Sequence, residues 1–158
     1  MTNANSSAST RTSRVIKASP GTLYRAFTDP AALAVWLSPG EMTGKVYEFD
    51  ARVGGGYRMS LFYPSSEQVY RGKTAEREDR FTARFVELAP PTRIVEAITF
   101  DTADPAFLGE MTMVVTFKEA DGGTEVTILF EHIPPGIRPE DNAAGSRSSL
   151  EKLARYVE

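Results

Sequence analysis

Three consecutive glycines, Gly54–Gly56, open a run in which apolar and polar residues alternate. One face of that run carries Tyr57, Met59, Leu61 and Tyr63. This period of two is typical of a half-buried β-strand. Glycine weakens a strand, so three in a row make sense where a sheet bends sharply or where another backbone comes close. The run therefore predicts a curved sheet with the Tyr57 face turned inward.

A glycine-rich stretch can also cradle a phosphate, but the sequence lacks the rest of that chemistry. No Gly-Lys-Ser/Thr follows Gly56, and the next element is predicted to be a strand. A phosphate loop needs a helix there, because the helix N-terminus receives the anion. We therefore interpret the glycines as a bend.

Composition limits the classes of partner. The chain has 158 residues, 41% of them hydrophobic, and a net charge of −3, which fits one ordinary domain with no general affinity for nucleic acid or anionic lipid. With no cysteine there is no disulfide, thiolate metal site or thiol nucleophile, which is compatible with the cytoplasm. The longest purely apolar run, residues 31–37, is too short to span a membrane.

The first twelve residues are polar and have no apolar core of the kind that a secretory signal needs. A transit peptide would also be rich in serine, but here a single arginine precedes Arg14. We predict a flexible polar tail over residues 1–12, followed by a single domain over residues 13–158.

Capping and turn residues along the chain predict the order of helices and strands. Ser19-Pro20 and Asp29-Pro30 each join an N-cap residue to a proline at the first helical position, so two short helices should follow the first strand. The predicted strands are Arg14 to Ala18, Lys45 to Asp50, Tyr57 to Tyr63, Val69 to Glu78, Arg80 to Leu88, Arg93 to Phe100, Glu110 to Lys118 and Thr124 to Glu131. The mixed charges of Arg71 to Arg80 indicate a solvated hairpin.

A long helix is predicted over Pro139 to Val157, with apolar and small residues at three- and four-residue spacing along one face. Strands joined by short turns favour an antiparallel sheet, and the long helix is the element available to cover its apolar side. The predicted class is α+β.

Several ordered motifs carry a resemblance to a known family. They are Phe49 to Gly55 with Tyr57-Arg58, Phe85 to Leu88 with Pro91, Arg93 to Glu96, Gly109 to Thr112, Gly122 to Val126, Pro134-Pro135-Gly136, and Gly145 with Leu150 and Leu153. In order and spacing they resemble homologues of the activator of the heat-shock protein 90 ATPase, within the START-like, or SRPBCC, superfamily. That resemblance, from Arg14 onward, implies a helix-grip fold: a curved antiparallel sheet of six to seven strands wrapped round a long C-terminal helix.

The resemblance also implies a cavity between the sheet and the last helix, which holds a lipid, sterol or aromatic molecule in many members of the superfamily. Similar sequences often have tryptophan after the glycine of the last helix, where this chain has Ser146. We expect a deeper or more polar pocket there. The predicted ligand-binding residues are Trp36, Tyr57, Met59, Leu61, Tyr63, Glu96, Ile98, Phe100, Met111, Met113, Ser146 and Leu150.

Glu96 is the most interesting acid. Ile94, Ile98 and Phe100 share its parity, which would place its carboxyl on an apolar face, raise its pKa and suit it to proton transfer or to holding a polar ligand group. The opposite parity stays open at this point, because Val95, Ala97 and Thr99 could equally face inward.

Other candidate groups have weaker support. His132 is the chain's one histidine, and a strand-end surface position suits it better than catalysis. Asp50 and Arg52 share a strand face, as a surface ion pair or a cavity salt bridge. The loop around Asp101 and Asp104 lacks the ligand density of a calcium site, and we expect neither a metal nor a cofactor.

Three functional classes follow. The first is a domain that binds a small apolar molecule, with no reaction assigned. The second is a co-chaperone-type module that binds a protein and stimulates a chaperone ATPase, as the family name suggests. The third is an enzyme of the cyclase or lyase kind that uses Glu96 or His132. A homodimer is compatible with each class.

Overall fold

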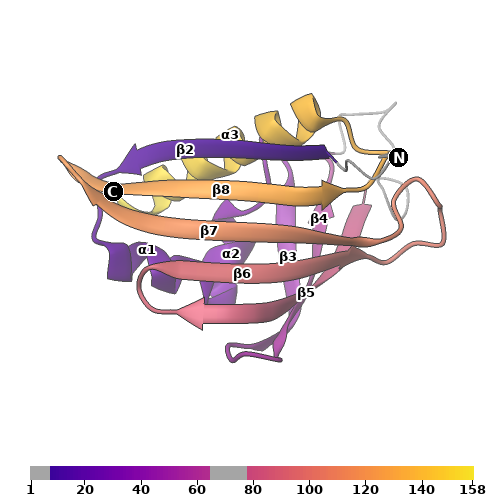
Figure 1. The fold of residues 1–158 in the computed structure, drawn as a ribbon, viewed down its shortest axis with the longest axis horizontal. Coiled ribbons are helices and arrows are strands. Elements are labelled where there is room, and N and C mark those ends of the chain that lie inside the picture. Colours follow the sequence, from indigo (N-terminus) through magenta and orange to yellow (C-terminus); the bar gives the residue numbers. More distant parts are fainter. Residues whose placement is uncertain (1–7, 65–77) are drawn as a thin grey trace, which may run out of the picture.

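The computed structural model describes residues 8–64 and 78–158. Within them, seven antiparallel strands form one curved sheet in the order β2-β8-β7-β6-β5-β4-β3 (Figure 1). The strands are β2 (Ala8–Ile16), β3 (Thr43–Asp50), β4 (Gly56–Phe62), β5 (Glu78–Ala89), β6 (Arg93–Phe100), β7 (Glu110–Ala120) and β8 (Gly123–Ile133). The helices are α1 (Pro20–Phe27), α2 (Pro30–Trp36) and α3 (Pro139–Val157). This arrangement confirms the predicted α+β helix-grip fold.

The two short helices begin as their capping residues predicted. Ser19 Oγ accepts a hydrogen bond from the Thr22 amide at 3.2 Å, and Asp29 Oδ1 accepts one from the Ala31 amide at 3.0 Å. Each contact satisfies an amide that has no partner inside its helix. The proline that follows each cap occupies the first helical turn without losing a hydrogen bond.

The first strand is longer than predicted. β2 begins at Ala8 and pairs with β8 from Ala8 opposite Ile133 to Ile16 opposite Thr124. The flexible tail predicted for residues 1–12 is therefore wrong for residues 8–12. The physical reason is that main-chain pairing with β8 holds an edge strand whose side chains are mostly polar. Most of another predicted strand, Val69 to Glu78, lies outside the described residues.

The three glycines form a tight connection between β3 and β4. A Cβ on Gly56 would lie 1.9 Å from the Ala83 carbonyl oxygen on β5, a distance that no side chain can occupy. Next to it, the Phe85 amide donates to the Gly55 carbonyl at 2.9 Å. The glycines therefore allow the close backbone approach that the sequence predicted, and they fix where Tyr57 enters β4.

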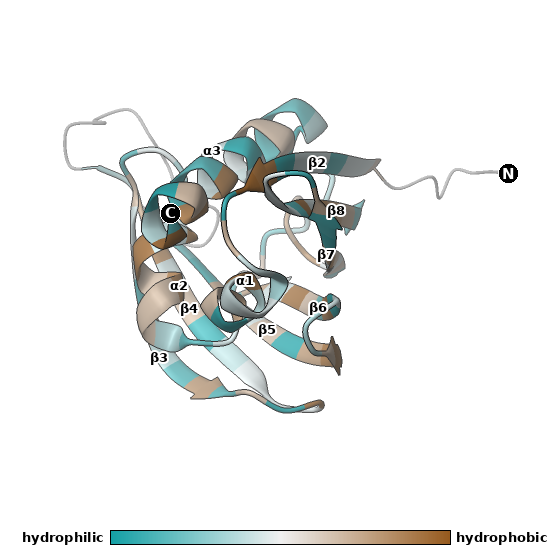
Figure 2. Ribbon diagram, turned by 90° about the vertical axis from the view of Figure 1, so that its left-hand side faces the viewer, coloured by the Kyte–Doolittle hydropathy of each residue, from teal (hydrophilic) through white to brown (hydrophobic). Residues whose placement is uncertain are grey.

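The helices lie on the inner side of the curved sheet (Figure 2). α3 packs against β2 and α2, and α2 packs against β3, so a helix lies along each edge strand. Aromatic rings fill the space beneath α1 and α2, where Phe27 lies 4.6 Å from Trp36 and 5.4 Å from Phe117 between ring centroids. In the described part of the chain, no helix has both the length and the apolar character to cross a membrane.

Candidate functional site

Glu96 lies on the inner face of β6, in the middle of the sheet. It stands opposite Phe85 of β5 and Met113 of β7, and its side chain is 0% exposed. The parity that the sequence left open is settled by its contact with Tyr57, another inner-face residue. Val95 and Ala97 are also buried, on the opposite face of β6. Because both faces of the strand carry buried apolar residues, the sequence pattern could not show which face Glu96 is on.

A buried hydrogen bond joins Tyr57 to Glu96. The Tyr57 hydroxyl donates to Glu96 Oε1 at 2.7 Å, reaching from β4 across β5 to β6. Glu96 Oε2 is buried too, and no group in residues 8–64 or 78–158 forms a hydrogen bond with it. A buried oxygen without a partner is uncommon, because its desolvation is not compensated.

Aromatic rings surround this pair. Tyr57 stacks on Phe49 with 5.4 Å between ring centroids, and it lies 6.1 Å from Phe81 and 5.8 Å from Phe85. The carboxyl therefore lies in a medium of low polarity. Such a medium disfavours its charged form.

Burial raises the pKa of Glu96 to about 7, and the hydrogen bond from Tyr57 opposes that rise only in part. Burial also raises the pKa of Tyr57 well above its usual 10, and the neighbouring Glu96 carboxylate adds to the increase. Near neutral pH, Tyr57 thus keeps its proton and donates, while Glu96 exchanges its own. This is the combination that proton transfer or a polar ligand group requires.

Most of the other predicted site residues also face the interior. Met59, Ile98, Phe100, Met111, Met113, Ser146 and Leu150 are buried, whereas Leu61 and Tyr63 are half-buried. Trp36 is buried as well, but it belongs to the aromatic packing beneath α1 and α2. Its Nε1 donates to the Ala26 carbonyl at 3.0 Å, which gives the indole a structural role.

Sequence reasoning missed Asp79. This residue is 3% exposed on the inner face of β5, and its Oδ2 accepts a hydrogen bond from the Tyr63 hydroxyl at 2.8 Å. We interpreted Arg71 to Arg80 as a solvated hairpin, which is wrong for residues 78–80 because they begin β5. The parity of Phe81 and Phe85 would have placed Asp79 inward.

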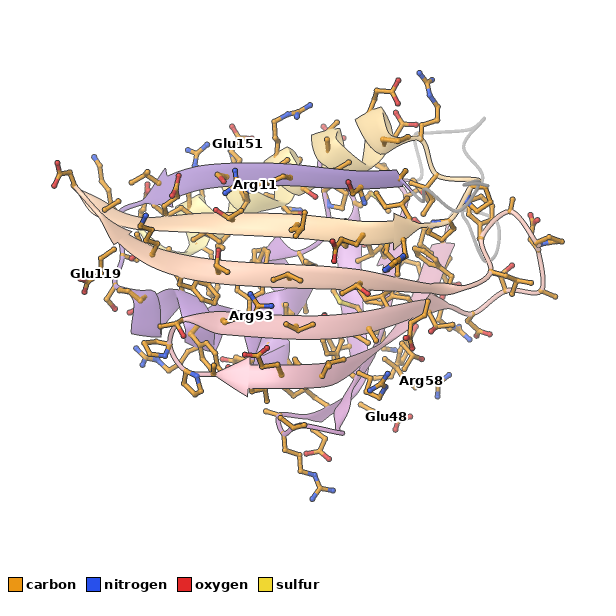
Figure 3. All side chains as sticks on the ribbon, in the orientation of Figure 1. Arg11, Glu48, Arg58, Arg93, Glu119 and Glu151 are labelled. Carbon is orange, nitrogen blue, oxygen red and sulfur yellow. The ribbon has the colours of Figure 1, made fainter. Side chains whose placement is uncertain are left out.

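The remaining candidates lie at the surface. His132 is exposed at the end of β8 with a φ of 60°, and the ion pair between Arg52 Nε and Asp50 Oδ2, at 2.8 Å, leaves the arginine side chain 79% exposed. Across the described ranges, no three histidine, aspartate or glutamate side chains gather as metal ligands. Figure 3 views the outer face of the sheet, where Arg93 lies, and this residue forms an ion pair with Glu87 at 3.1 Å.

A hollow of about 400 Å³ lies beside the connection between β3 and β4. Its lining residues are Glu48, Phe49, Asp50, Gly54, Gly55, Gly56, Tyr57, Arg58, Thr82, Ala83 and Arg84. Glu96 is not among these lining residues, and Tyr57 is only 3% exposed, so the hollow lies outside the packed interior that holds the carboxyl.

A second charged group lies where α3 meets the loop after α2. Lys152 Nζ donates to the carbonyl oxygens of Ser38 at 2.5 Å, Gly40 at 3.2 Å and Met42 at 3.4 Å, and to Ser38 Oγ at 3.2 Å. Burial, and to a smaller extent the charge of Arg155, lowers the pKa of Lys152. One helix turn earlier, Ser149 Oγ donates to the Leu37 carbonyl at 2.6 Å, so polar contacts fix α3 above α2.

Comparison with known proteins identifies the family. The family model of Activator of Hsp90 ATPase homolog 1-like protein matches residues 17–158. The chain belongs to this family. None of the curated proteins that were compared matches it.

Solved structures of Activator of Hsp90 ATPase homolog 1-like proteins and of other bacterial proteins have the same fold. A Chromobacterium violaceum protein is 36% identical, over 96% of this chain and 98% of its own, with a TM-score of 0.81. An Aeromonas hydrophila member of the family is 20% identical, over 95% and 92%, with a TM-score of 0.69. A Rhodobacter sphaeroides protein is 21% identical, over 94% and 90%, with a TM-score of 0.74. At these last two identities the likeness is one of fold.

Proposed function

We propose that the protein binds a small, largely apolar molecule at the inner face of its sheet, with α3 as the opposite wall. The observation that carries this proposal is Glu96, a fully buried carboxyl with one oxygen that accepts no hydrogen bond from the described residues. Ligand sites are mostly apolar and contain a few polar groups that orient the ligand. The rings around Tyr57 and the thioethers of Met59 and Met113 supply the apolar part.

The methionines support an adaptable site. Met113 is directly opposite Glu96 in the sheet, and Met59 is 0% exposed on the same inner face as Tyr57. Thioether side chains are flexible and polarizable, so they can rearrange around a guest at low cost. An interior with methionines beside the carboxyl can thus be tightly packed when no ligand is bound and can rearrange to admit a ligand.

Native mass spectrometry of the protein purified from its own host tests the proposal. The expected result is a mass above that of the chain, which falls to the chain mass when an apolar molecule is released on activation in the gas phase. The bare chain mass alone, with no change in melting temperature across a panel of apolar aromatic compounds, would contradict it. Stoichiometric capture of a chaperone would favour the co-chaperone class, and twice the chain mass would reveal a homodimer.

Ser146 is part of the same proposal. It is 7% exposed on the inner side of α3, and we propose that its small side chain leaves room for the bound molecule. Ser146→Trp should then weaken the binding of an apolar aromatic compound, because the indole would fill that room. Arg147→Trp is the matched control, since Arg147 is exposed on the same helix turn. Equal binding by both variants would remove Ser146 from the site.

A reaction of the cyclase or lyase kind is a second candidate, and Glu96 is the observation that favours it. A carboxyl with a pKa of about 7 can both accept and give a proton near neutral pH. His132, exposed at the end of β8, lies outside this environment. If turnover of a bound aromatic molecule is found, Glu96→Gln should abolish it and His132→Ala should not. The reverse result would assign the chemistry to His132.

A further inference from the structure

The two oxygens of the Glu96 carboxyl have different environments. Oε1 accepts the Tyr57 hydroxyl at 2.7 Å, whereas Oε2 has no donor within the described residues. Its cross-strand neighbours, Phe85 and Met113, carry no hydrogen-bond donor on their side chains, and Tyr57 donates to Oε1. The described residues therefore supply a donor to one oxygen of the carboxyl and none to the other.

We propose that Glu96 Oε2 is the polar anchor for a hydroxyl-bearing aromatic molecule, whose O–H takes the place of the missing donor. This proposal rests on the proposed function, because it names the chemical class of the molecule bound at the same site. In the complex, the ligand hydroxyl donates to Oε2 while Tyr57 continues to donate to Oε1. The two hydroxyls then share one carboxylate from opposite sides.

The surroundings favour a neutral hydroxyl over a cationic amine. A protonated amine would have to lose its water shell and enter a site lined by rings and a thioether, and this cost commonly exceeds the gain from the ion pair. A hydroxyl donates one hydrogen bond and adds no charge. Hydrogen bonds to an ionised acceptor are also about twice as strong as neutral ones.

The rings favour an aromatic molecule. Phe49, Phe81 and Phe85 lie 5.4 to 6.1 Å from Tyr57 between ring centroids, in stacked, T-shaped and tilted arrangements. A guest ring can adopt the same geometries against them. The hollow of about 400 Å³ beside the glycines does not include Glu96 in its lining, so a guest ring reaches the carboxyl when the packed rings and thioethers move apart.

Three probes of nearly equal size test the anchor: 2-naphthol, 2-methoxynaphthalene and naphthalene. Only 2-naphthol can donate, whereas 2-methoxynaphthalene keeps the oxygen without the proton. Isothermal titration calorimetry with the full chain at pH 8, where Glu96 is mainly ionised, should give 2-naphthol an affinity about tenfold or more above that of 2-methoxynaphthalene. Glu96→Met should reduce this preference to below about threefold, and Glu96→Gln should retain part of it, because an amide oxygen is a weaker acceptor.

Glu119→Met is the matched control, since it makes the same substitution at an exposed carboxyl of β7 that lies outside the site. It should keep the preference for 2-naphthol. If Glu96→Met does not fold, the ¹³C resonance of the Glu96 carboxyl in the unmodified protein gives the same answer. That resonance should shift with 2-naphthol and stay unchanged with 2-methoxynaphthalene.

The outcomes separate the two proposals. Equal affinities for the three probes, unchanged in Glu96→Met, would overturn the hydroxyl anchor and leave apolar binding intact. No binding of any probe to the unmodified protein would overturn both. A preference for 2-naphthol that survives Glu96→Met would move the anchor elsewhere, and this proposal would be wrong.

Discussion

Glu96 and Lys152 both place a charged group away from bulk water, but the protein surrounds them differently. Lys152 Nζ has four oxygen acceptors within 3.4 Å, all from the loop after α2. Glu96 has a single donor, Tyr57, and an oxygen without a partner in the described chain. Polar groups of this fold thus satisfy the hydrogen bonds of a partly desolvated charge at Lys152. Glu96 lacks such a set of partners, and this difference points to a function other than packing.

The difference extends to the effect of each charge on stability. Burial shifts both pKa values toward the neutral form, that of Glu96 upward and that of Lys152 downward. The pKa of Glu96 rises to about 7. By linkage, the charged form of each group is therefore less favourable in the folded protein than in the unfolded chain. At Lys152 the hydrogen bonds to the loop offset part of that cost, whereas Glu96 has a single donor.

Gly56→Ala should have the largest effect on stability, and it should disturb the surroundings of Glu96 but not those of Lys152. The new Cβ would meet the Ala83 carbonyl oxygen at 1.9 Å, so β4 would have to move, and Tyr57 with it. We expect the free energy of unfolding to fall by about 4 kcal/mol, measured by urea denaturation. Gly54→Ala is the control: at a φ of +87° with open space around it, it should cost only about 1 kcal/mol. Equal losses would show that the backbone approach at Gly56 is not restrictive.

Ionisation of Glu96 should make stability depend on pH. Its pKa is about 7 in the folded protein against an ordinary 4.5, so the folded state holds the proton more tightly between these values. The contribution is therefore complete below about pH 4.5 and is lost as the pH rises through 7, a decrease of about 3 kcal/mol in the free energy of unfolding. The measurement is the difference between the unmodified protein and Glu96→Gln from pH 4.5 to 8, which cancels the other carboxyls. A constant difference would contradict the raised pKa.

Tyr57→Phe should increase the difference between Glu96 and Lys152, because it leaves Glu96 with no donor from the described residues. We expect a loss of about 2 kcal/mol at pH 8, where the carboxyl is ionised, and a smaller loss at pH 5. The pKa of Glu96 should rise further, because the hydrogen bond from Tyr57 lowers it. A ¹³C titration of the carboxyl measures this shift. Phe49→Leu, which changes the ring stacked on Tyr57, is the control and should alter the pKa less.

Much of the fold could be predicted because its signals are local. The caps at Ser19 and Asp29 fixed two helix starts, and the spacing over Pro139–Val157 gave the bounds of α3. The first strand was predicted too short because its side chains are mostly polar, and its stability comes from pairing with β8, which is 108 residues or more away in sequence. Pairing of this kind leaves little trace in one strand's own composition.

The site was predictable only in part, for the same reason. The sequence indicated that Glu96 could face an apolar interior, but Val95 and Ala97 made the opposite parity equally plausible. The deciding contact comes from Tyr57, 39 residues away and two strands across. Lys152 has no sequence signature at all, because its partners on the loop are mainly backbone carbonyls, whose positions depend on how α2 ends.

Lys152→Met should have the smallest effect on stability, and its pH dependence should differ from that of the change at Glu96. The substitution keeps much of the side-chain volume and removes the donor for three carbonyls and a hydroxyl. Because the site is partly open to water, which can replace the lost contacts, we expect a loss of about 1 kcal/mol. Arg155→Met, an exposed change in the same helix turn, should cost less. The loss at Lys152 should stay the same from pH 5 to 8, whereas the cost at Glu96 should vary over that range. If both varied alike, the half-buried charge of Lys152 and the buried carboxyl of Glu96 would respond to pH in the same way, and the unpartnered oxygen of Glu96 would not distinguish it from an ordinary packed group.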